Sequence, residues 1–164
     1  MKRLWAPWRM KYIEQADKTE GCIFCTLPAE NKDEEKLILH RGKTAFIMLN
    51  SFPYNNGHLM VAPFKHTADM QDLEDEELLE IQRLLRYAIR LLTETMHPDG
   101  FNIGVNLGLT AGAGVADHIH WHIVPRWNGD TNFMPVVADT KVLPDSLQST
   151  YKKLKKKIEE LGAA

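Results

Sequence analysis

The sequence predicts a single α+β domain with an antiparallel sheet, and three observations support this. The chain has 164 residues, close to the ~150 residues of a typical domain, so one hydrophobic core is expected. Short β-rich runs lie between turn signals. Two longer segments repeat apolar residues at spacings of three and four, as amphipathic helices do. No internal repeat or linker divides the chain, so we expect one domain over residues 1–164.

The composition excludes several classes of protein. Apolar residues make up 44% and charged residues 26%, a globular balance that argues against disorder. The formal net charge of −2 gives no overall positive field for nucleic acid. The longest charge-free stretch, 101–116, contains polar residues and glycines, so it cannot serve as a ~20-residue membrane span. The start lacks a secretory signal core, and we expect a cytoplasmic protein that binds no membrane.

The N-terminal half predicts an arm followed by three strands. Residues 1–20 are expected to be an irregular arm, and its large aromatic side chains would need a covering surface, such as a partner subunit. The runs 37–39 and 44–49 predict a hairpin. A turn rich in Pro, Asn and Gly at 53–57 then leads into a third strand over 58–62.

The C-terminal half predicts two helices and further strands. An acidic first turn and the apolar spacing predict a long helix over 72–97, which ends before a proline. Strands are expected over 101–105 and 118–124, with a short extended piece over 133–138. The last segment, 144–161, predicts a helix with one apolar side, and its lysines are expected on a solvated face.

The strongest chemical signal is the alternation of His118, His120 and His122 with large apolar residues. In a strand, this spacing puts the three imidazoles on one face and the intervening side chains in the core. Three such residues could hold a catalytic metal. Alternatively, one could attack phosphorus while the others position the phosphate. Ordinary polar residues on a wet face are the third interpretation, which strict alternation disfavours.

A glycine-rich segment from Asn106 to Gly114 precedes the histidines. Such a turn brings backbone N–H groups close to an anion above the histidine face. This combination favours a phosphate ligand.

With these motifs the sequence resembles the histidine triad (HIT) family, whose signature alternates three histidines with apolar residues, as 118–124 does. The segments 127–135 and 139–144 resemble the branch that contains diadenosine tetraphosphate hydrolases and phosphorylases. The resemblance implies an α+β homodimer with a five-stranded antiparallel sheet, one long helix and a C-terminal helix per subunit. Further matches are Gly21-Cys-Ile-Phe-Cys25, Asn50 ahead of Gly57-His58, Ala62-Pro-Phe-Lys-His66 and Asn106.

The resemblance also implies roles for single residues. His120 would attack the α-phosphorus and form a nucleotidyl-histidine, which water or inorganic phosphate then cleaves. His122 would bind the α-phosphate oxygens, and Asn50 the ribose, although Asn50 could simply open a turn. His58 matches a supporting histidine, or it is a solvated residue at a strand end. The implied catalytic residues are His120 and His122, and the implied nucleotide-binding residues are Asn50, Asn106, Gly112, Gly114, His120 and His122.

One position departs from the family pattern. Many relatives place Ser or Thr where this chain has Gly114, and the stretch up to His118 is one residue longer here. Backbone N–H groups could substitute, and Thr110 is another possible hydroxyl. The group that protonates the leaving group and the acceptor of the second step therefore stay open.

The two cysteines, Cys22 and Cys25, are spaced C-x-x-C. This spacing supplies two of the four ligands of tetrahedral zinc, while two buried cysteines without metal, or redox chemistry, remain alternatives. The resemblance implies His66 and His118 as the other ligands of a structural site, which would leave His120 free. Magnesium is expected only with the polyphosphate, since no carboxylate cluster suggests a protein site for it.

The leading hypothesis is therefore an enzyme that cleaves dinucleoside polyphosphates such as diadenosine tetraphosphate. A phosphorylase, a nucleoside phosphoramidase and a non-catalytic nucleotide-binding regulator are the alternatives, along with a zinc-dependent interaction module that uses Cys22 and Cys25. A mere binding site has no need of a nucleophile between two further histidines. We expect a homodimer whose interface uses the long helix and the N-terminal arm.

Overall fold

The computed structural model describes residues 21–131 and 143–162, and these residues contain a five-stranded antiparallel sheet with strand order β1-β2-β3-β5-β4. The α+β class and the five-stranded sheet are thereby confirmed. The arm at 1–20 and the extended piece predicted over 133–138 lie outside the described residues. The strands are β1 (Ile38–Arg41), β2 (Ala45–Leu49), β3 (Leu59–Pro63), β4 (Gly100–Val105) and β5 (Trp121–Arg126).

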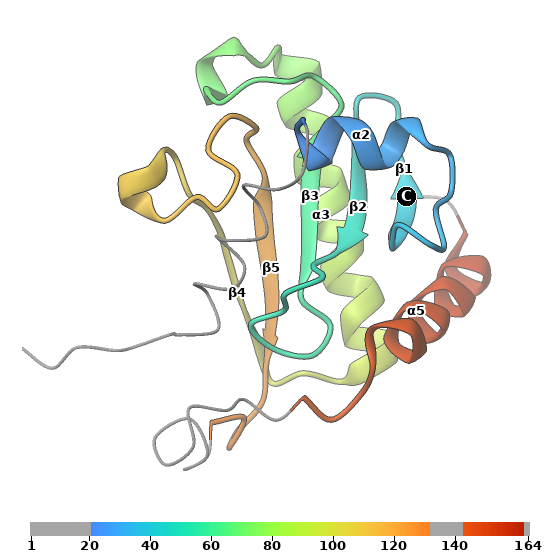
Figure 1. Ribbon diagram of the computed structural model, residues 1–164. Coiled ribbons are helices and arrows are strands. Elements are labelled where there is room, and N and C mark those ends of the chain that lie inside the picture. The colour runs from blue at the N-terminus through green and yellow to red at the C-terminus, as the bar shows by residue number, and fades with distance from the viewer. Residues whose placement is uncertain (1–20, 132–142, 163–164) are drawn as a thin grey trace, which may run out of the picture.

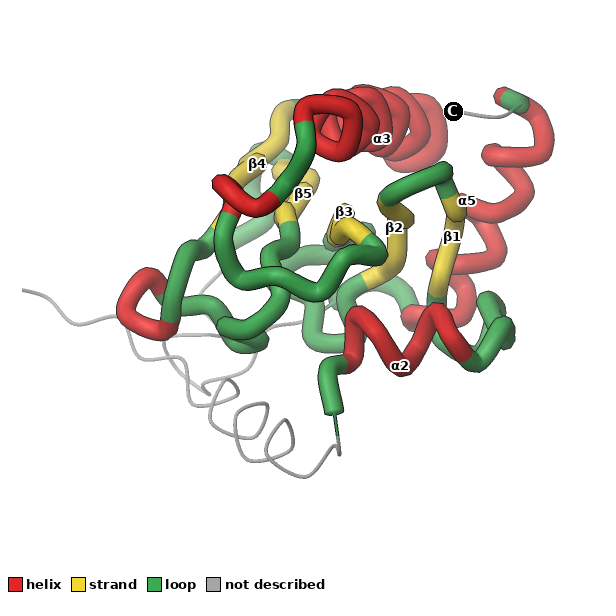
Figure 2. The backbone as a smooth tube through the Cα atoms, turned by 90° about the horizontal axis from the view of Figure 1, so that it is seen from above, coloured by secondary structure: helices red, strands yellow, loops and turns green. Residues whose placement is uncertain are grey.

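The sheet lies between helices of different length (Figures 1 and 2). The long helix α3 (Asp75–Met96) covers one face, and its buried side chains join those of the central strands in the main core. Helix α5 (Leu147–Leu161) lies beside α3 and the β1 edge, and the short helix α2 (Ile23–Ala29) lies on the opposite face of the sheet. A second, smaller core forms under α2 around Phe24.

Helix α3 begins later than its acidic residues suggest. Residues Met70–Asp72 form a separate 3-10 turn, and α3 starts at Asp75 behind the capping box of Glu74 and Glu77. These reciprocal hydrogen bonds satisfy N–H groups at the helix start, which fixes the boundary there. The helix ends at Met96, and the backbone of the C-cap residue His97 is left-handed (φ 49°).

The β1–β2 hairpin is held by Glu80 of α3. Its carboxylate accepts the backbone N–H of Lys43 at 2.6 Å, and also the backbone N–H and hydroxyl of Thr44. A Cβ on Gly42 would stand 2.6 Å from Glu80 Oε1 and 3.0 Å from the carbonyl oxygen of Ala45, so a larger residue there would displace the Glu80 carboxylate from the hairpin. Burial raises the pKa of Glu80, but the hydrogen bonds from the hairpin outweigh it and hold that pKa below its ordinary value.

Helix α5 begins at Leu147 rather than at residue 144, because the side chain of Ser146 caps it by accepting the N–H of Ser149 at 3.1 Å. Its Tyr151 hydroxyl donates to the carbonyl of Ile38 at 3.0 Å, and Lys155 donates to the next carbonyl along β1. The helix therefore covers the β1 edge of the sheet.

Strand β5 is shifted relative to the predicted 118–124, because it begins at Trp121 and ends at Arg126. The segment before it pairs elsewhere, since the N–H of Ile119 donates to the carbonyl of Thr67 at 2.7 Å. The alternation nevertheless holds: Ile119, Trp121 and Ile123 are buried in the main core. The intervening histidines therefore face the other side of the sheet.

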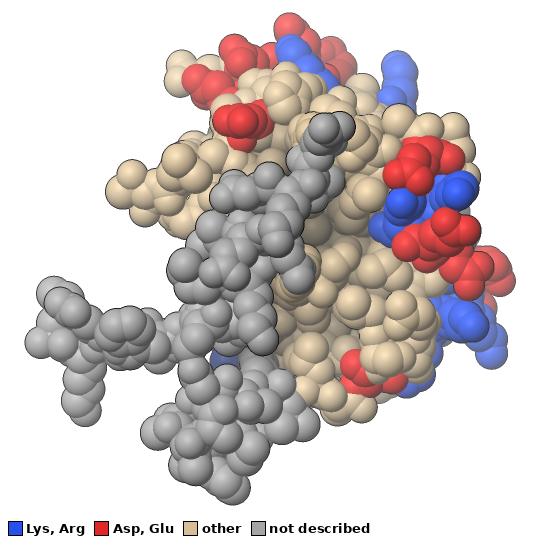
Figure 3. All heavy atoms as spheres, viewed as in Figure 1, with Lys and Arg blue, Asp and Glu red and all other residues tan. Residues whose placement is uncertain are grey.

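Charged side chains are unevenly distributed over the face shown in Figure 3. Lysine and arginine mix with aspartate and glutamate at the top and along one side, while the centre carries mostly uncharged residues. In the described part of the chain, every helix is too short or too polar to cross a membrane.

Candidate active site and Cys/His cluster

The C-x-x-C motif lies at the start of helix α2. Cys22 is the N-cap residue, and its carbonyl accepts the N–H groups of Cys25 at 3.0 Å and Thr26 at 2.9 Å. Phe24 points into the molecule, where its ring lies 5.3 Å from that of His118 and 4.5 Å from that of His120. The helix thus brings both thiols to the histidine face.

The four predicted metal ligands come together: the ligand atoms of Cys22, Cys25, His66 and His118 lie within 4.8 Å of one another. His118 Nδ1 is 3.2 Å from Cys22 Sγ and 3.3 Å from His66 Nδ1, and Cys25 Sγ is 3.4 Å from His66 Nδ1. With metal–ligand bonds of about 2.0–2.3 Å, the edges of a tetrahedral zinc site are of this size. The arrangement therefore fits a closed Cys₂His₂ site.

Two further observations fit a cation in this cluster. His118 Nε2 lies 2.9 Å from the carbonyl of Pro63; since a carbonyl only accepts, Nε2 carries the proton and Nδ1 turns its lone pair towards the thiols. Burial, with a hydrogen bond and charge from Cys22, raises the pKa of the Cys25 thiol. Two adjacent thiolates therefore need a positive charge between them.

His120 is fixed in the opposite tautomer. Its Nδ1 lies 2.8 Å from the backbone carbonyl of His118 and donates to it, so the lone pair is on Nε2. The side chain is only 4% exposed, and burial lowers its pKa despite that backbone hydrogen bond. Around neutral pH, His120 is therefore an uncharged imidazole with a free nitrogen, the form that a nucleophile requires.

His122 is oriented by the fully buried His58. The backbone N–H of Tyr54 donates to His58 Nδ1 at 3.1 Å, so the proton of a neutral His58 is on Nε2. This Nε2 lies 3.0 Å from His122 Nδ1 and donates to it. Neutral His122 then carries its own proton on Nε2, a donor next to the nucleophile, with ring centroids of His120 and His122 4.9 Å apart.

Asn50 opens the turn that leads to His58. Its Oδ1 accepts the N–H of Phe52 at 2.8 Å, and its Nδ2 lies 3.3 Å from His58 Nδ1. The turn role that the sequence allowed is therefore present, and ribose binding stays a prediction. Gly57 in the same turn has φ +74°, and a Cβ there would stand 2.7 Å from Met96 Sδ, so this position requires glycine.

The glycine-rich segment forms a compact turn. Gly108 and Gly112 have positive φ, on either side of a 3-10 turn at Leu109–Ala111. Asn106 Nδ2 donates to the carbonyl of Gly112 at 3.4 Å and so ties β4 to this turn. Thr110, the alternative hydroxyl, lies in the exposed part of the turn. The structure thus gives Asn106 a role in shaping the turn, and direct phosphate contacts remain a prediction.

Arg126 is a residue of this face that the sequence analysis missed. Side chains two apart in a strand share a face, and β5 continues beyond His122 to Arg126. The signal was present, since the alternation of His118, His120 and His122 continues at position 126.

The comparisons with known proteins agree with this geometry. The HIT domain profile matches residues 31–129. The chain is 40% identical to the "AP-4-A phosphorylase" of Mycobacterium tuberculosis, covering 94% of this chain and 83% of that protein. It is 28% identical to an adenosine 5'-monophosphoramidase of Schizosaccharomyces pombe, over 85% of this chain and 99% of that protein.

A solved structure with a similar fold is a Zn-bound histidine triad family protein from Mycobacterium smegmatis. It superposes with a TM-score of 0.69 at 25% identity, covering 86% of this chain and 95% of that one. The profile match, the mycobacterial relative and the arrangement of His118, His120 and His122 agree, and the chain belongs to the HIT domain family.

Proposed function

We propose that the chain is a nucleotidyl transferase that cleaves dinucleoside polyphosphates, such as diadenosine tetraphosphate, at the α-phosphate through His120. One observation carries this proposal: the carbonyl of His118 holds the proton of His120 on Nδ1, which leaves Nε2 as a free nucleophile. A pure binding site has no use for this tautomer, because a neutral lone pair does not attract an anionic phosphate.

The neighbouring groups support the chemistry. Attack by His120 Nε2 on the α-phosphorus would expel the remaining polyphosphate, and the Nε2–H of His122 would donate a proton to the departing oxygen. Asn50 would contact the ribose. Asn106 would support the α-phosphate site by shaping the turn that contains Gly112 and Gly114. The N–H of Gly112 already donates to the carbonyl of Leu109 at 2.9 Å, so the backbone N–H of Gly114 would be the donor to a phosphate oxygen.

Inorganic phosphate is the acceptor that we propose for the second step. The relative named AP-4-A phosphorylase, which matches most of this chain, supports this choice over water. Transfer to phosphate would give ADP, with ATP as the first product. The phosphoramidase relative is less similar to this chain and supports the same nucleotidyl-histidine with a different leaving group. Magnesium would arrive with the polyphosphate.

The test is to incubate the protein with diadenosine tetraphosphate, with and without phosphate, and to resolve the products. ADP plus ATP, formed only with phosphate, is expected. AMP plus ATP in both conditions would replace phosphate by water as the acceptor. Two ADP without phosphate would contradict attack at the α-phosphorus, and absence of turnover in all conditions would leave a nucleotide-binding regulator.

We also propose that Cys22, Cys25, His66 and His118 bind one structural zinc ion. When bound, zinc would stabilise both thiolates and tie α2 to the segment that leads into β5. The closed ligand set leaves His120 outside it. Free thiols at such a site suit a reducing compartment such as the cytoplasm.

The sequence predicted a homodimer through the long helix and the N-terminal arm, but the arm lies outside the described residues. The exposed apolar side chains at the other end of the sheet lead us to propose the β4 edge as the interface instead. Strand β4 ends the sheet, and its Ile103, which points to the core side, is 45% exposed. Leu107 and Leu109, which follow β4, are 50% and 76% exposed. A second copy would cover this apolar edge. Light scattering should report twice the monomer mass of 18.8 kDa, and a monomer at micromolar concentration would contradict the proposal.

A further inference from the structure

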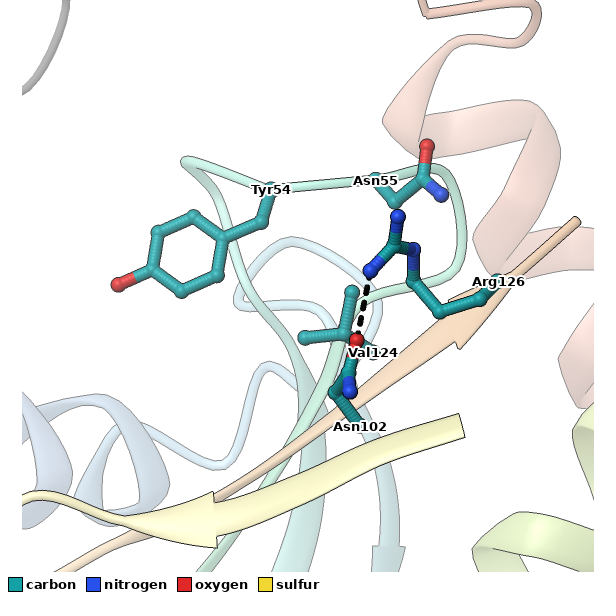
Figure 4. A pocket seen from close by; sticks show the side chains of 5 residues that line it. All are labelled: Tyr54, Asn55, Asn102, Val124 and Arg126. Carbon is teal, nitrogen blue, oxygen red and sulfur yellow. Dashed lines mark hydrogen bonds between the residues drawn. The ribbon is translucent and has the colours of Figure 1, made fainter. Parts of the chain in front are cut away.

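A small cavity continues the histidine face on the side away from the Cys/His cluster. Its lining residues are Tyr54, Asn55, Asn102, Val124 and Arg126 (Figure 4), and its volume is about 250 Å³. Sites that enclose a drug-sized ligand measure roughly 300–1,000 Å³. The cavity therefore suits part of a larger ligand.

The strand register places this cavity next to the candidate active site. His122, Val124 and Arg126 alternate along β5 and share one face. In β4, Asn102 lies opposite Val124 and Gly104 lies opposite His122. A Cβ on Gly104 would meet nothing within 4 Å among the described residues, which therefore leave the surface beside His122 open. One step of two residues, ~6.7 Å, separates His122 from the floor of the cavity.

Arg126 brings hydrogen-bond donors to the cavity. Its Nε and Nη2 donate to Asp130 at 2.6 and 2.9 Å, and its Nη1 donates to Asn102 Oδ1 at 2.7 Å. Figure 4 shows the guanidinium close to Val124, with its bond to Asn102 as a dashed line. A guanidinium has five N–H groups, and among the described residues no partner takes the other two, one on each terminal nitrogen.

The ion pair orients Arg126 without using all of its donors. Asp130 accepts two hydrogen bonds from the guanidinium, which fixes its position and raises the pKa of Arg126. Asp130 is itself fixed, because Asn55 Nδ2 donates to it at 2.9 Å. A positioned guanidinium with spare N–H groups matches the oxygens of a phosphate group.

We propose that this cavity is a subsite for the phosphate groups beyond the bond that breaks, and that both the leaving polyphosphate and the entering inorganic phosphate use it. The proposal rests on the proposed role of His120. In the first step, Nε2 bonds to the α-phosphorus while the bond to the bridging oxygen breaks. That oxygen keeps the electron pair and takes the proton of His122 Nε2.

In the second step, an oxygen of hydrogen phosphate bonds to the α-phosphorus and the N–P bond breaks. Its electron pair returns to His120 Nε2, and the proton of the phosphate passes to His122 Nε2. The entering and departing groups lie roughly in line in such transfers, so both occupy the side of the phosphorus opposite His120. The leaving chain and the acceptor therefore share one place, which Arg126 would contact.

The first test measures binding alone and does not depend on catalytic activity. Tripolyphosphate and AMP are titrated calorimetrically into the full chain and into Arg126→Gln and Asp130→Asn. Arg126→Gln should weaken tripolyphosphate binding roughly 10- to 100-fold, as expected for loss of hydrogen bonds from a charged group, and should leave AMP binding unchanged. Asp130→Asn breaks the ion pair but keeps the guanidinium, so binding should persist. Unchanged tripolyphosphate binding in Arg126→Gln, or equal losses of both ligands in both variants, would overturn the proposal.

The second test measures the leaving polyphosphate and the entering inorganic phosphate separately. Arg126→Gln should slow formation of the nucleotidyl-enzyme from diadenosine tetraphosphate roughly 10- to 100-fold, but not its formation from adenosine 5'-phosphoramidate, whose leaving group has no phosphate. The phosphate concentration needed for half-maximal transfer should rise by a similar factor. A loss in only one of these arms would overturn the shared subsite. If the wild-type chain turns over neither substrate, the proposed function fails, while the tripolyphosphate titration still decides the subsite.

Discussion

His118 and His120 are two residues apart, and both are nearly inaccessible to solvent, yet the structure suits them to different chemistry. In His118, Nε2–H donates a hydrogen bond to the carbonyl of Pro63, and the lone pair of Nδ1 points into the Cys/His cluster. In His120, Nδ1–H donates a hydrogen bond to the carbonyl of His118, and the lone pair is on Nε2. The comparison shows that the nitrogen bound by the main chain decides whether an imidazole suits a metal or a phosphorus atom.

The most direct way to break this comparison is to remove the free nitrogen of His120. His120→Ala should lower kcat by at least about 10³-fold, because the covalent step needs the imidazole. Nucleotide binding and zinc content should change little, since other groups supply them. Single-turnover kinetics and isothermal titration measure the two effects. Retention of more than a tenth of the activity, or a nucleotidyl adduct on another histidine, would contradict the assignment.

The other side of the comparison is tested by removing two ligands of the cluster. Cys22→Ser with Cys25→Ser should abolish zinc binding and destabilise the fold by about 3–5 kcal/mol, which lowers the melting temperature by roughly 10 °C. Activity should persist in the folded fraction. Elemental analysis and thermal unfolding with and without a chelator provide the measurements.

Two results would contradict this second prediction. Protein purified without chelator that contains no metal, with both substitutions tolerated at no cost in stability, would remove the zinc site. Loss of catalysis on metal removal at unchanged stability would show that the histidines hold a catalytic metal, and the nucleophile assignment of His120 would be wrong.

A smaller effect is expected from His58, which acts on His122 and not on substrate. His58→Phe removes the donor to His122 Nδ1 while keeping a ring in the buried space. We expect kcat to fall roughly 10- to 100-fold, the value of a hydrogen bond in a buried pair, with a changed pH profile. His58→Gln, whose amide can donate, should restore part of the rate. Equal losses in both variants, with unchanged pH profiles, would indicate only a packing role.

The smallest effect is expected at a site remote from both histidines. Glu80→Gln should reduce the free energy of unfolding by about 1 kcal/mol at pH 7, because the hairpin loses a charged acceptor. The pKa of Glu80 is held below its ordinary value of 4.5, so its contribution is complete above that value and is lost as the pH falls through the lower, folded-state pKa. Denaturant unfolding at pH 7 and below pH 4 should show the difference shrink. Turnover and zinc content should stay unchanged.

The periodic features of this chain could be predicted from sequence. The alternation after His118 placed Ile119, Trp121 and Ile123 in the core, because two-residue periodicity depends only on strand geometry. The spacing of the apolar residues in α3 likewise predicted a long helix over one face of the sheet. The C-x-x-C pair and the more distant His66 and His118 were predicted to meet, from the family resemblance rather than from any local pattern.

Other features depend on contacts that no local pattern contains. Helix α2 has only seven residues and includes Pro28. So short a helix is stabilised by tertiary packing, here around Phe24, and its local sequence does not predict it. Strand β5 was placed too early because the N–H of Ile119 pairs with Thr67, a residue remote in sequence. Arg126 was missed because Pro125 reads as a strand end. Strand β5 can nevertheless contain Pro125, which has no backbone N–H, because the pairing of β5 with β3 ends at Ile123, before the proline.

The acceptor that fixes His120 belongs to the main chain of its neighbour, and this affects how the site can change over evolution. Substitution at position 118 alters a side chain but leaves a carbonyl there, so the tautomer of His120 does not depend on which residue precedes it. The nucleophile is thereby protected from drift at that position. The Cys/His cluster has no such protection, because each of its four candidate ligands is a side chain. A lineage could therefore lose the cluster and keep the nucleophile, provided that other packing held α2 in place.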